Sequence, residues 1–168
     1  MQTRLPRVRL IGIVTALSLV ATLAVVGPAQ ASQPPRVTVN VVDCMGGSGT
    51  VEVAAGAPLL LEAGWAALTP LHELEFFISQ RTVASINGAP IRLASLYWRP
   101  PQKTYPFPDL PWNMSWDYPV HALKHGQSIT VAYEWYLRFP VSDGVDTYPS
   151  GPVLAPFGYL PSCTITAD

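Results

Sequence analysis

The segment from residue 97 to residue 119 carries the side chains best suited to ligand binding. Aromatic residues are interspersed with proline there, and proline disfavours both a helix and a central strand, so we expect a long, stiff loop. Flat rings on a rigid loop fit sugar faces or the surface of an extracellular protein. The alternative is that the rings fold back and cap one end of the domain. The candidate ligand-binding residues are Trp98, Tyr105, Phe107, Trp112, Trp116 and Tyr118.

The histidines offer weaker chemistry. His121 and His125 have the spacing of a metal pair on a helix, but Gly126 and a strong strand pattern follow at once. A helix has little room there, and no third ligand is close in sequence. We therefore expect exposed loop histidines, with no metal site.

The acidic residues favour structural or solvent-exposed roles. Glu73 and Glu75 are two positions apart and cannot share a helix face, so we expect surface charges. Glu134 is predicted to belong to a solvated charged face of its strand. Asp143 and Asp146 favour a turn, since the segment lacks the ligand density of a calcium loop. With no nucleophile elbow and no phosphate loop, the sequence predicts neither an enzyme nor a cofactor.

Length and charge limit the class of protein. The chain has 168 residues, of which 12% are charged, with 10 basic and 11 acidic side chains and a net charge of −1. This length fits one domain. The balance of charge excludes a polybasic nucleic-acid binder, and the apolar content of 49% excludes a wholly disordered chain.

The first 31 residues have the pattern of a secretory signal peptide. Three arginines precede the uncharged run at 10–26, and Ala29 and Ala31 are the small residues that a cleavage site requires. We expect cleavage after Ala31, a flexible lead at 32–35, and a secreted domain at 36–168 without a membrane span. The alternative is an uncleaved anchor, because the run reaches the lower edge of a spanning length.

The two cysteines indicate one disulfide. In an exported chain Cys44 and Cys163 are expected to pair, joining the first and last strands and enclosing nearly the whole domain. The alternatives are two free thiols or a metal pair.

Alternation of apolar and polar residues predicts a β-rich domain. Strands are expected at 36–43, 50–53, 58–62, 128–139 and 162–167. Asn87-Gly88 predicts a hairpin within 82–91. Thr69-Pro70 followed by Leu71, Leu74 and Ile78 favours a short helix, while Leu74, Phe76 and Ile78 also fit a strand. These elements predict an all-β fold, an antiparallel β-sandwich with at most one short helix.

Several local features combine into a known layout. They are Gly64-Trp65, the Asn-Gly-x-Pro hairpin at 87–90, the strand entry at 125–131, Asp143-Gly144, and a last strand that carries a cysteine. In this layout residues 36–168 resemble bacterial secreted domains of the immunoglobulin-like type. The resemblance implies a β-sandwich that serves as an adhesion, ligand-binding or accessory module. The antibody disulfide pattern is not met, because the cysteines lie near the ends of the domain.

Three classes of function fit the sequence. We expect a non-enzymatic extracellular binding or interaction module, with a carbohydrate or an extracellular protein as partner. A purely structural envelope or matrix component is the first alternative. A secreted hydrolase is the second, and it would need two carboxylates or a Ser/His pair converging in a cleft.

Overall fold

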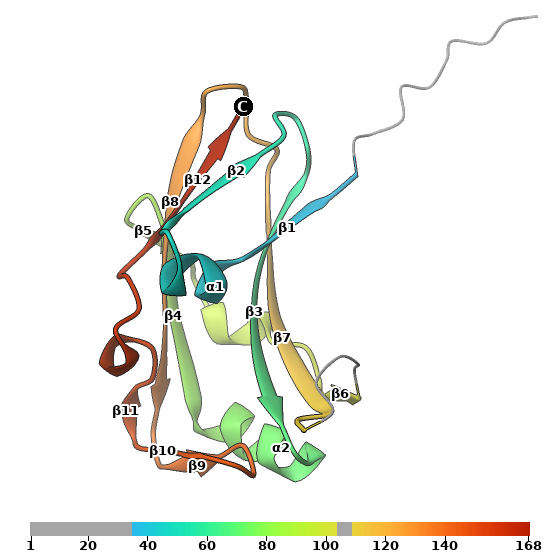
Figure 1. Ribbon diagram of the computed structural model, residues 1–168, viewed down its shortest axis with the longest axis vertical. Helices are drawn as coiled ribbons and strands as arrows, with labels where there is room; N and C mark the ends of the chain where they lie inside the picture. The colour runs from blue at the N-terminus through green and yellow to red at the C-terminus, as the bar shows by residue number, and fades with distance from the viewer. Residues whose placement is uncertain (1–34, 104–108) are drawn as a thin grey trace, which may run out of the picture. The chain divides into compact units, whose positions relative to one another are not determined.

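Two large β-sheets and the two-stranded antiparallel sheet β9–β10 form the fold of the described residues, 35–103 and 109–168, in a computed structural model (Figure 1). The strands are β1 (Val37–Asn40), β2 (Thr50–Val53), β3 (Leu59–Ala67), β4 (Gln80–Ile86), β5 (Ala89–Pro90), β6 (Gln102–Lys103), β7 (Trp112–Val120), β8 (Ser128–Leu137), β9 (Val141–Ser142), β10 (Thr147–Tyr148), β11 (Gly151–Pro152) and β12 (Cys163–Ala167). The helices are α1 (Val41–Gly46) and α2 (Pro70–Ser79), with 3₁₀ turns η1 (Ala94–Tyr97) and η2 (Ala155–Phe157).

The sheets are mixed, which corrects the expectation of a purely antiparallel sandwich. The first sheet has the order β1-β3-β7-β6, and the second has the order β2-β12-β8-β4-β5 with β11 also beside β8. β1 runs parallel to β3, and β2 runs parallel to β12. β1 and β3 are neighbours in the first sheet, but between them in the sequence the chain crosses to the second sheet, forms β2 there and then returns. This crossover allows β1 and β3 to run parallel (Figure 1).

The inner faces of the two sheets share one core. The predicted strand at 128–139 is confirmed as β8, and every second side chain of this strand is buried. From the first sheet, Met114 and Trp116 of β7 and Trp65 of β3 point to the same interior. The buried side chains of β8 are Ile129, Val131, Tyr133, Trp135 and Leu137.

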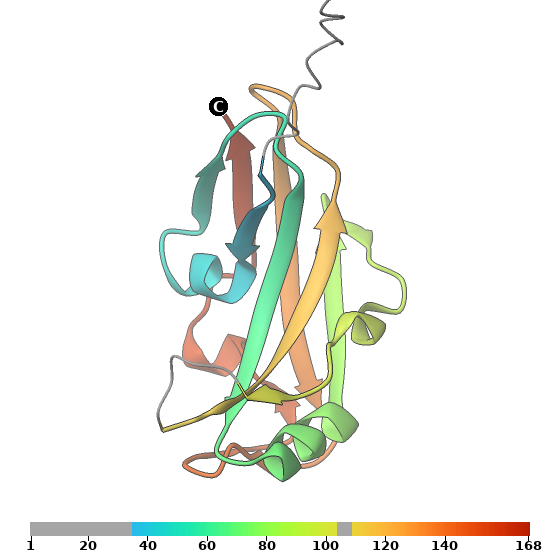
Figure 2. The same ribbon diagram turned by 90° about the vertical axis from the view of Figure 1, so that its right-hand side faces the viewer.

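The predicted helix after Thr69 is confirmed as α2, which closes one end of the space between the sheets (Figures 1 and 2). Thr69 caps it by accepting the backbone N–H of His72 at 3.3 Å, and Pro70 occupies the first turn. The residues whose spacing predicts the helix, Leu71, Leu74 and Ile78, are exposed, while the opposite face is buried. The structure also contains α1, so the prediction of at most one short helix is wrong.

Two sequence predictions are wrong in their extent. The first strand ends at Asn40, whose side chain accepts the backbone N–H groups of Val42 and Asp43 and so starts α1. The loop predicted at 97–119 contains η1, β6 and the long strand β7. β7 forms because all but one of the prolines of this segment precede it, and Pro119 lies near its end.

The hairpin at Asn87-Gly88 and the terminal strand are confirmed as β4–β5 and β12. The disulfide between Cys44 and Cys163 is also confirmed, with Cα atoms 5.6 Å apart. Cys44 lies in α1, so the bond joins a helix to the last strand and not two strands.

Within the described ranges, no helix combines the length and apolar character needed to cross a membrane.

Candidate functional site

The aromatic residues predicted to bind a ligand divide between core and surface. Trp98 is 7% exposed and Trp116 is fully buried. Both indole N–H groups have internal partners: Trp98 donates to Thr82 Oγ1 at 2.8 Å, and Trp116 donates to the carbonyl of Ala94 at 2.7 Å. These two rings therefore stabilise the core and offer no surface to a ligand.

The remaining predicted residues do not extend a common surface. Trp112 and Tyr118 are half-buried, and Tyr118 stacks on Trp116 with ring centroids 5.8 Å apart. Tyr105 and Phe107 lie outside the described residues. Where the segment is described, its rings largely fold back onto the sandwich, because alternate residues of β7 face the second sheet.

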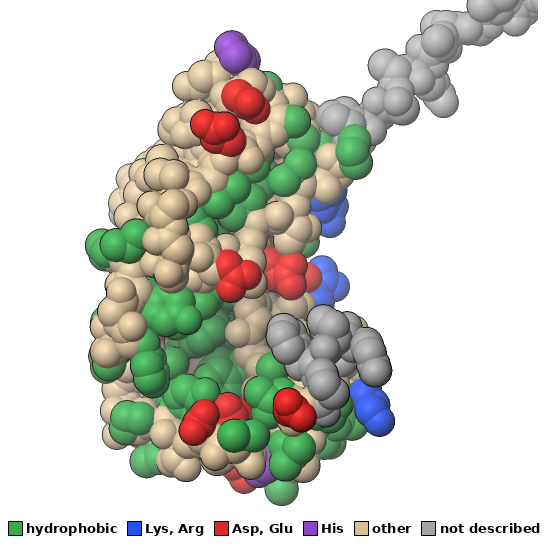
Figure 3. All heavy atoms as spheres, in the orientation of Figure 1, with side chains coloured by type: hydrophobic (Ala, Val, Ile, Leu, Met, Phe, Trp, Pro, Cys, Tyr) green, Lys and Arg blue, Asp and Glu red, His purple; other side chains and the backbone are tan. Residues whose placement is uncertain are grey.

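A different set of aromatic side chains lines a recess between the two sheets. The recess has a volume of about 520 Å³ and lies between β3 on one side and β10 and η2 on the other. Figure 3 shows a hollow with hydrophobic side chains on this side of the domain. The five aromatic residues that line it are Trp65, Trp135, Tyr148, Phe157 and Tyr159.

These rings run from the interior to the surface. Trp65 and Trp135 are buried and meet edge to face at 6.1 Å, whereas Phe157 is 63% exposed. Tyr148 lies between the buried rings and Phe157: its ring centroid is 4.7 Å from that of Trp65 and 6.2 Å from that of Phe157. The recess therefore presents a continuous aromatic wall to an entering group.

Asp143 is the acidic residue among those that line the recess, and both of its carboxylate oxygens already accept hydrogen bonds. Asp143 is 4% exposed, and its Oδ1 accepts the backbone N–H groups of Val145 and Asp146, both at 2.7 Å. Its Oδ2 accepts the hydroxyl proton of Tyr148 at 3.0 Å. Burial, reinforced by Asp143, raises the pKa of Tyr148 to about 12. The predicted turn is confirmed, and its acid holds the loop rather than serving as a free base.

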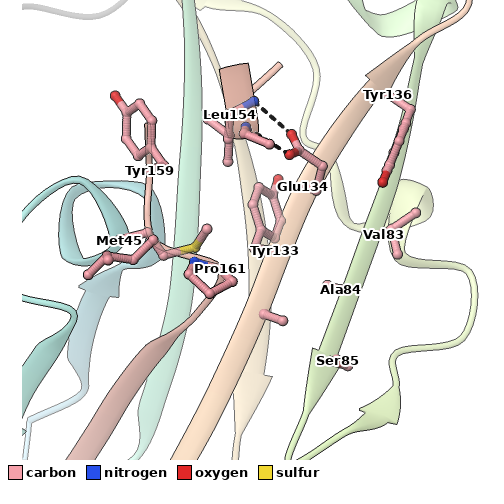
Figure 4. Close-up of a pocket in the computed structure, with 13 residues that line it drawn as sticks. Met45, Val83, Ala84, Ser85, Tyr133, Glu134, Tyr136, Leu154, Tyr159 and Pro161 are labelled. Carbon is pink, nitrogen blue, oxygen red and sulfur yellow. Dashed lines mark hydrogen bonds between the residues drawn. The ribbon is translucent and has the colours of Figure 1, made fainter. Parts of the chain in front are cut away.

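A smaller recess of about 300 Å³, whose lining residues Figure 4 shows, shares Leu154 and Tyr159 with the first. Glu134 reaches into it from β8, and its Oε1 accepts the backbone N–H groups of Val153 at 3.1 Å and Leu154 at 2.7 Å. Its Oε2 accepts that of Ala155 at 3.0 Å. The expectation of a solvated Glu134 is wrong, because the residue is half-buried and its carboxylate anchors residues 153–155, of which Leu154 lines both recesses.

The expectation of a surface charge is also wrong for Glu73. This residue is fully buried, and neither carboxyl oxygen has a hydrogen-bond partner among the residues that the structure describes. Burial raises the pKa of Glu73 to about 8. Nearby in the sequence, the buried Nε1 of Trp65 and Nδ1 of His72 also have no hydrogen-bond partner within 35–103 and 109–168. Glu75 is exposed as expected, and so are His121 and His125.

Comparisons with known proteins add no family to this geometry. No protein-family model, curated protein or solved structure matches the chain. Over residues 35–103 and 109–168, no three His, Cys, Asp or Glu residues come together as metal ligands. The function must therefore be argued from the recess itself.

Sequence reasoning missed most of the recess. Tyr148, Phe157 and Tyr159 lie in a stretch where aromatic residues are interspersed with proline, as they are at 97–119. The same signal was thus present at 148–161. What the sequence could not show is that this stretch lies opposite Trp65, which is far from it along the chain.

Proposed function

We propose that this chain is a secreted, non-enzymatic interaction module whose ligand site is the aromatic recess between β3 and η2. The observation that carries the proposal is the recess: about 520 Å³ lined by five aromatic rings that extend to the surface. Binding pockets in proteins have volumes of roughly 300–1,000 Å³ and mainly apolar walls with few polar groups.

The polar groups of the recess favour binding over catalysis. A general acid or base needs a free proton site within reach of a substrate. The Asp143 carboxylate accepts three internal hydrogen bonds, and the Tyr148 hydroxyl that donates one of them has a pKa of about 12. An uncharged apolar group is therefore the natural occupant of this recess.

We also propose that residues 1–31 are a signal peptide cleaved after Ala31 and that the domain is immunoglobulin-like. Support for export comes from the arginine-rich start, the uncharged run at 10–26 and the small residues before the cut. The Cys44–Cys163 disulfide fits an oxidising compartment. Intact mass of secreted protein tests the cut: a chain that begins at Ser32 is expected, and retention of residues 1–31 contradicts it.

Titration with N-phenyl-1-naphthylamine, an uncharged apolar fluorophore, tests the binding proposal. We expect a saturable rise in fluorescence at one site per chain. Phe157→Ala removes an exposed ring at the mouth of the recess and should weaken binding, because stacking area is lost.

Ile78→Ala is the matched control, because it removes an exposed apolar side chain from α2, outside the recess. Its affinity for the fluorophore should equal that of the wild-type protein. If Ile78→Ala weakens binding as much as Phe157→Ala, or if the fluorophore does not saturate, the recess is not the ligand site.

A further inference from the structure

The edge of β3 beside the recess lacks a strand partner among the described residues. β3 pairs with β7 along its whole length, from Leu59 to Ala67. On the other side, β1 pairs with it only as far as Asn40, opposite Glu62. In the described part of the chain, residues 63–67 of β3 therefore have a neighbouring strand on one side alone.

The open edge exists because β1 turns into a helix. Asn40 caps α1, which lies between the two large sheets and packs on β3 of the first and on β2, β8 and β12 of the second (Figure 1). The Cys44–Cys163 disulfide then fixes α1 to β12. β1 therefore does not continue beside the rest of β3. We refer to the resulting gap beside residues 63–67 as the open lane.

The open lane and the recess adjoin. Gly64 and Ala66, which are half-buried, line the recess together with the buried Trp65 between them. In a strand laid along this edge, alternate side chains would face the interior. One such side chain, placed opposite Trp65, would lie against the aromatic wall.

Negative charge gathers at one end of the open lane. Glu62 closes the β1 pairing, and burial, with Asp117 and Asp43 nearby, raises the pKa of Glu62. Asp117 forms an ion pair with Arg99. In the described part of the chain, no such pair engages Glu62 or Asp43. This end of the open lane therefore favours a cation on an incoming group.

We infer that the open lane binds an extended polypeptide segment, which adds a strand to β3 at residues 63–67, places an aromatic side chain in the recess, and sets a lysine or arginine beside Glu62 and Asp43. The inference rests on the proposed function, since it uses the same recess. A strand edge offers backbone donors and acceptors in a row, and strand addition is an established mode of peptide recognition.

The same observations disfavour a carbohydrate in the recess. A sugar needs several hydrogen-bond partners for its hydroxyl groups. The carboxylates at the recess and at its shared wall, Asp143 and Glu134, are both engaged by backbone N–H groups. A peptide brings its own backbone groups to the strand edge and needs only apolar contact in the recess.

A designed peptide probes this arrangement in the full disulfide-bonded protein. The probe is acetyl-Thr-Lys-Trp-Thr-Val-amide, whose tryptophan and lysine would point to opposite faces of an added strand. Titration is followed through the backbone amide signals in ¹⁵N-labelled protein. We expect saturable shifts confined to residues 62–67 and the recess, and slower amide hydrogen exchange at the edge.

Three peptide variants separate the contributions. Replacing tryptophan by alanine should weaken binding by about thirtyfold or more, as for a central anchor residue. Replacing lysine by glutamate should weaken it about two- to fivefold, as for an exposed charge pair. A peptide with the same side chains but N-methylated backbone amides should lose binding, because it cannot pair with the strand edge.

The variants Glu62→Gln and Asp43→Asn should remove the preference for lysine over glutamate in the peptide. The inference is overturned if the N-methylated peptide binds as well as its parent, or if shifts appear outside residues 62–67 and the recess. Absence of peptide binding in a protein that still binds N-phenyl-1-naphthylamine overturns the inference and leaves the proposed function intact. If the protein binds neither the peptide nor N-phenyl-1-naphthylamine, the inference and the proposed function are both overturned.

Discussion

Trp65 of β3 and Phe76 of α2 stack with their ring centroids 4.2 Å apart and their planes 6° apart. Phe76 also meets Trp98 at 5.1 Å and Trp135 at 5.7 Å, both edge to face. The stack thus ties α2 to the rings of both sheets. It also sets the orientation of the helix, because Phe76 is fully buried while Leu74 is 46% exposed.

The first prediction concerns this orientation. Phe76→Ala should lower the free energy of unfolding by about 3–5 kcal/mol, because it leaves a cavity among aromatic rings. Leu74→Ala, on the exposed face of the same helix, should change it by less than about 0.5 kcal/mol. Urea unfolding of the two variants measures both values. Similar losses would show that α2 packs through its other face.

The helix shows how far sequence alone can reach. The spacing of Leu71, Leu74 and Ile78 correctly predicts helical periodicity, yet this stripe faces solvent. Periodicity reports that a helix has two faces, but the choice between them depends on what the rest of the fold offers. Here the aromatic rings of β3 and β8 provide the packing for Phe76, and that surface is assembled only in the folded domain.

Strands follow the same division. Six regular alternations of apolar and polar residues suffice to predict β8. β7 was not predicted, because the sequence around it is rich in proline and the strand is defined by its pairing with β3. The candidate site was not predictable, because its walls come from α1, β3, β8, β10 and η2. No local pattern links these elements. The cysteines are the exception, because two cysteines in a chain with a predicted export signal leave one natural pairing, which the structure confirms.

The second prediction is a loss of stability as the pH rises. Burial raises the pKa of Glu73 from 4.5 to about 8 in the folded chain. Between these values the folded state keeps a proton that the unfolded state releases, so unfolding becomes more favourable with rising pH. The contribution of Glu73 is complete below pH 4.5 and is lost as the pH passes through 8.

Melting temperatures at several values between pH 5 and pH 9 measure this effect. Glu73→Gln should flatten the profile because it removes the ionisable group. Glu75→Gln, the same change at an exposed position two residues away, should preserve the slope. A profile for Glu73→Gln as steep as that of the wild-type protein would assign the pH dependence to another group.

The third prediction separates structural from binding roles in the segment at 97–119. Trp116 is fully buried, and its indole N–H donates to Ala94. Trp116→Ala should therefore lower the free energy of unfolding by about 3–5 kcal/mol. Trp112→Ala, at a half-buried position near the end of the sandwich, should lower it by clearly less. Thermal unfolding decides, and an unchanged melting temperature for Trp116→Ala would contradict the burial of this ring.

The last prediction concerns Glu134, which connects the fold to the recess. Its carboxylate accepts backbone N–H groups from Trp135, Val153, Leu154 and Ala155, at distances of 2.7–3.1 Å. Glu134→Gln replaces one acceptor oxygen by an NH2 group that cannot accept, so at least one of these four N–H groups loses its partner, and the remaining bonds are no longer made to a charged acceptor. We expect a loss of roughly 1.5–3 kcal/mol in the free energy of unfolding.

A second readout distinguishes this role from general destabilisation. The segment that Glu134 holds contributes Val153 and Leu154 to the recess, so its loosening should also weaken binding of N-phenyl-1-naphthylamine. Hydrogen exchange at the amides of 153–155 should accelerate more than exchange in β12. Glu75→Gln is the matched control and should leave both measurements unchanged. If exchange at 153–155 does not change in Glu134→Gln, the carboxylate does not hold the recess wall, and its hydrogen bonds contribute little to the shape of the site.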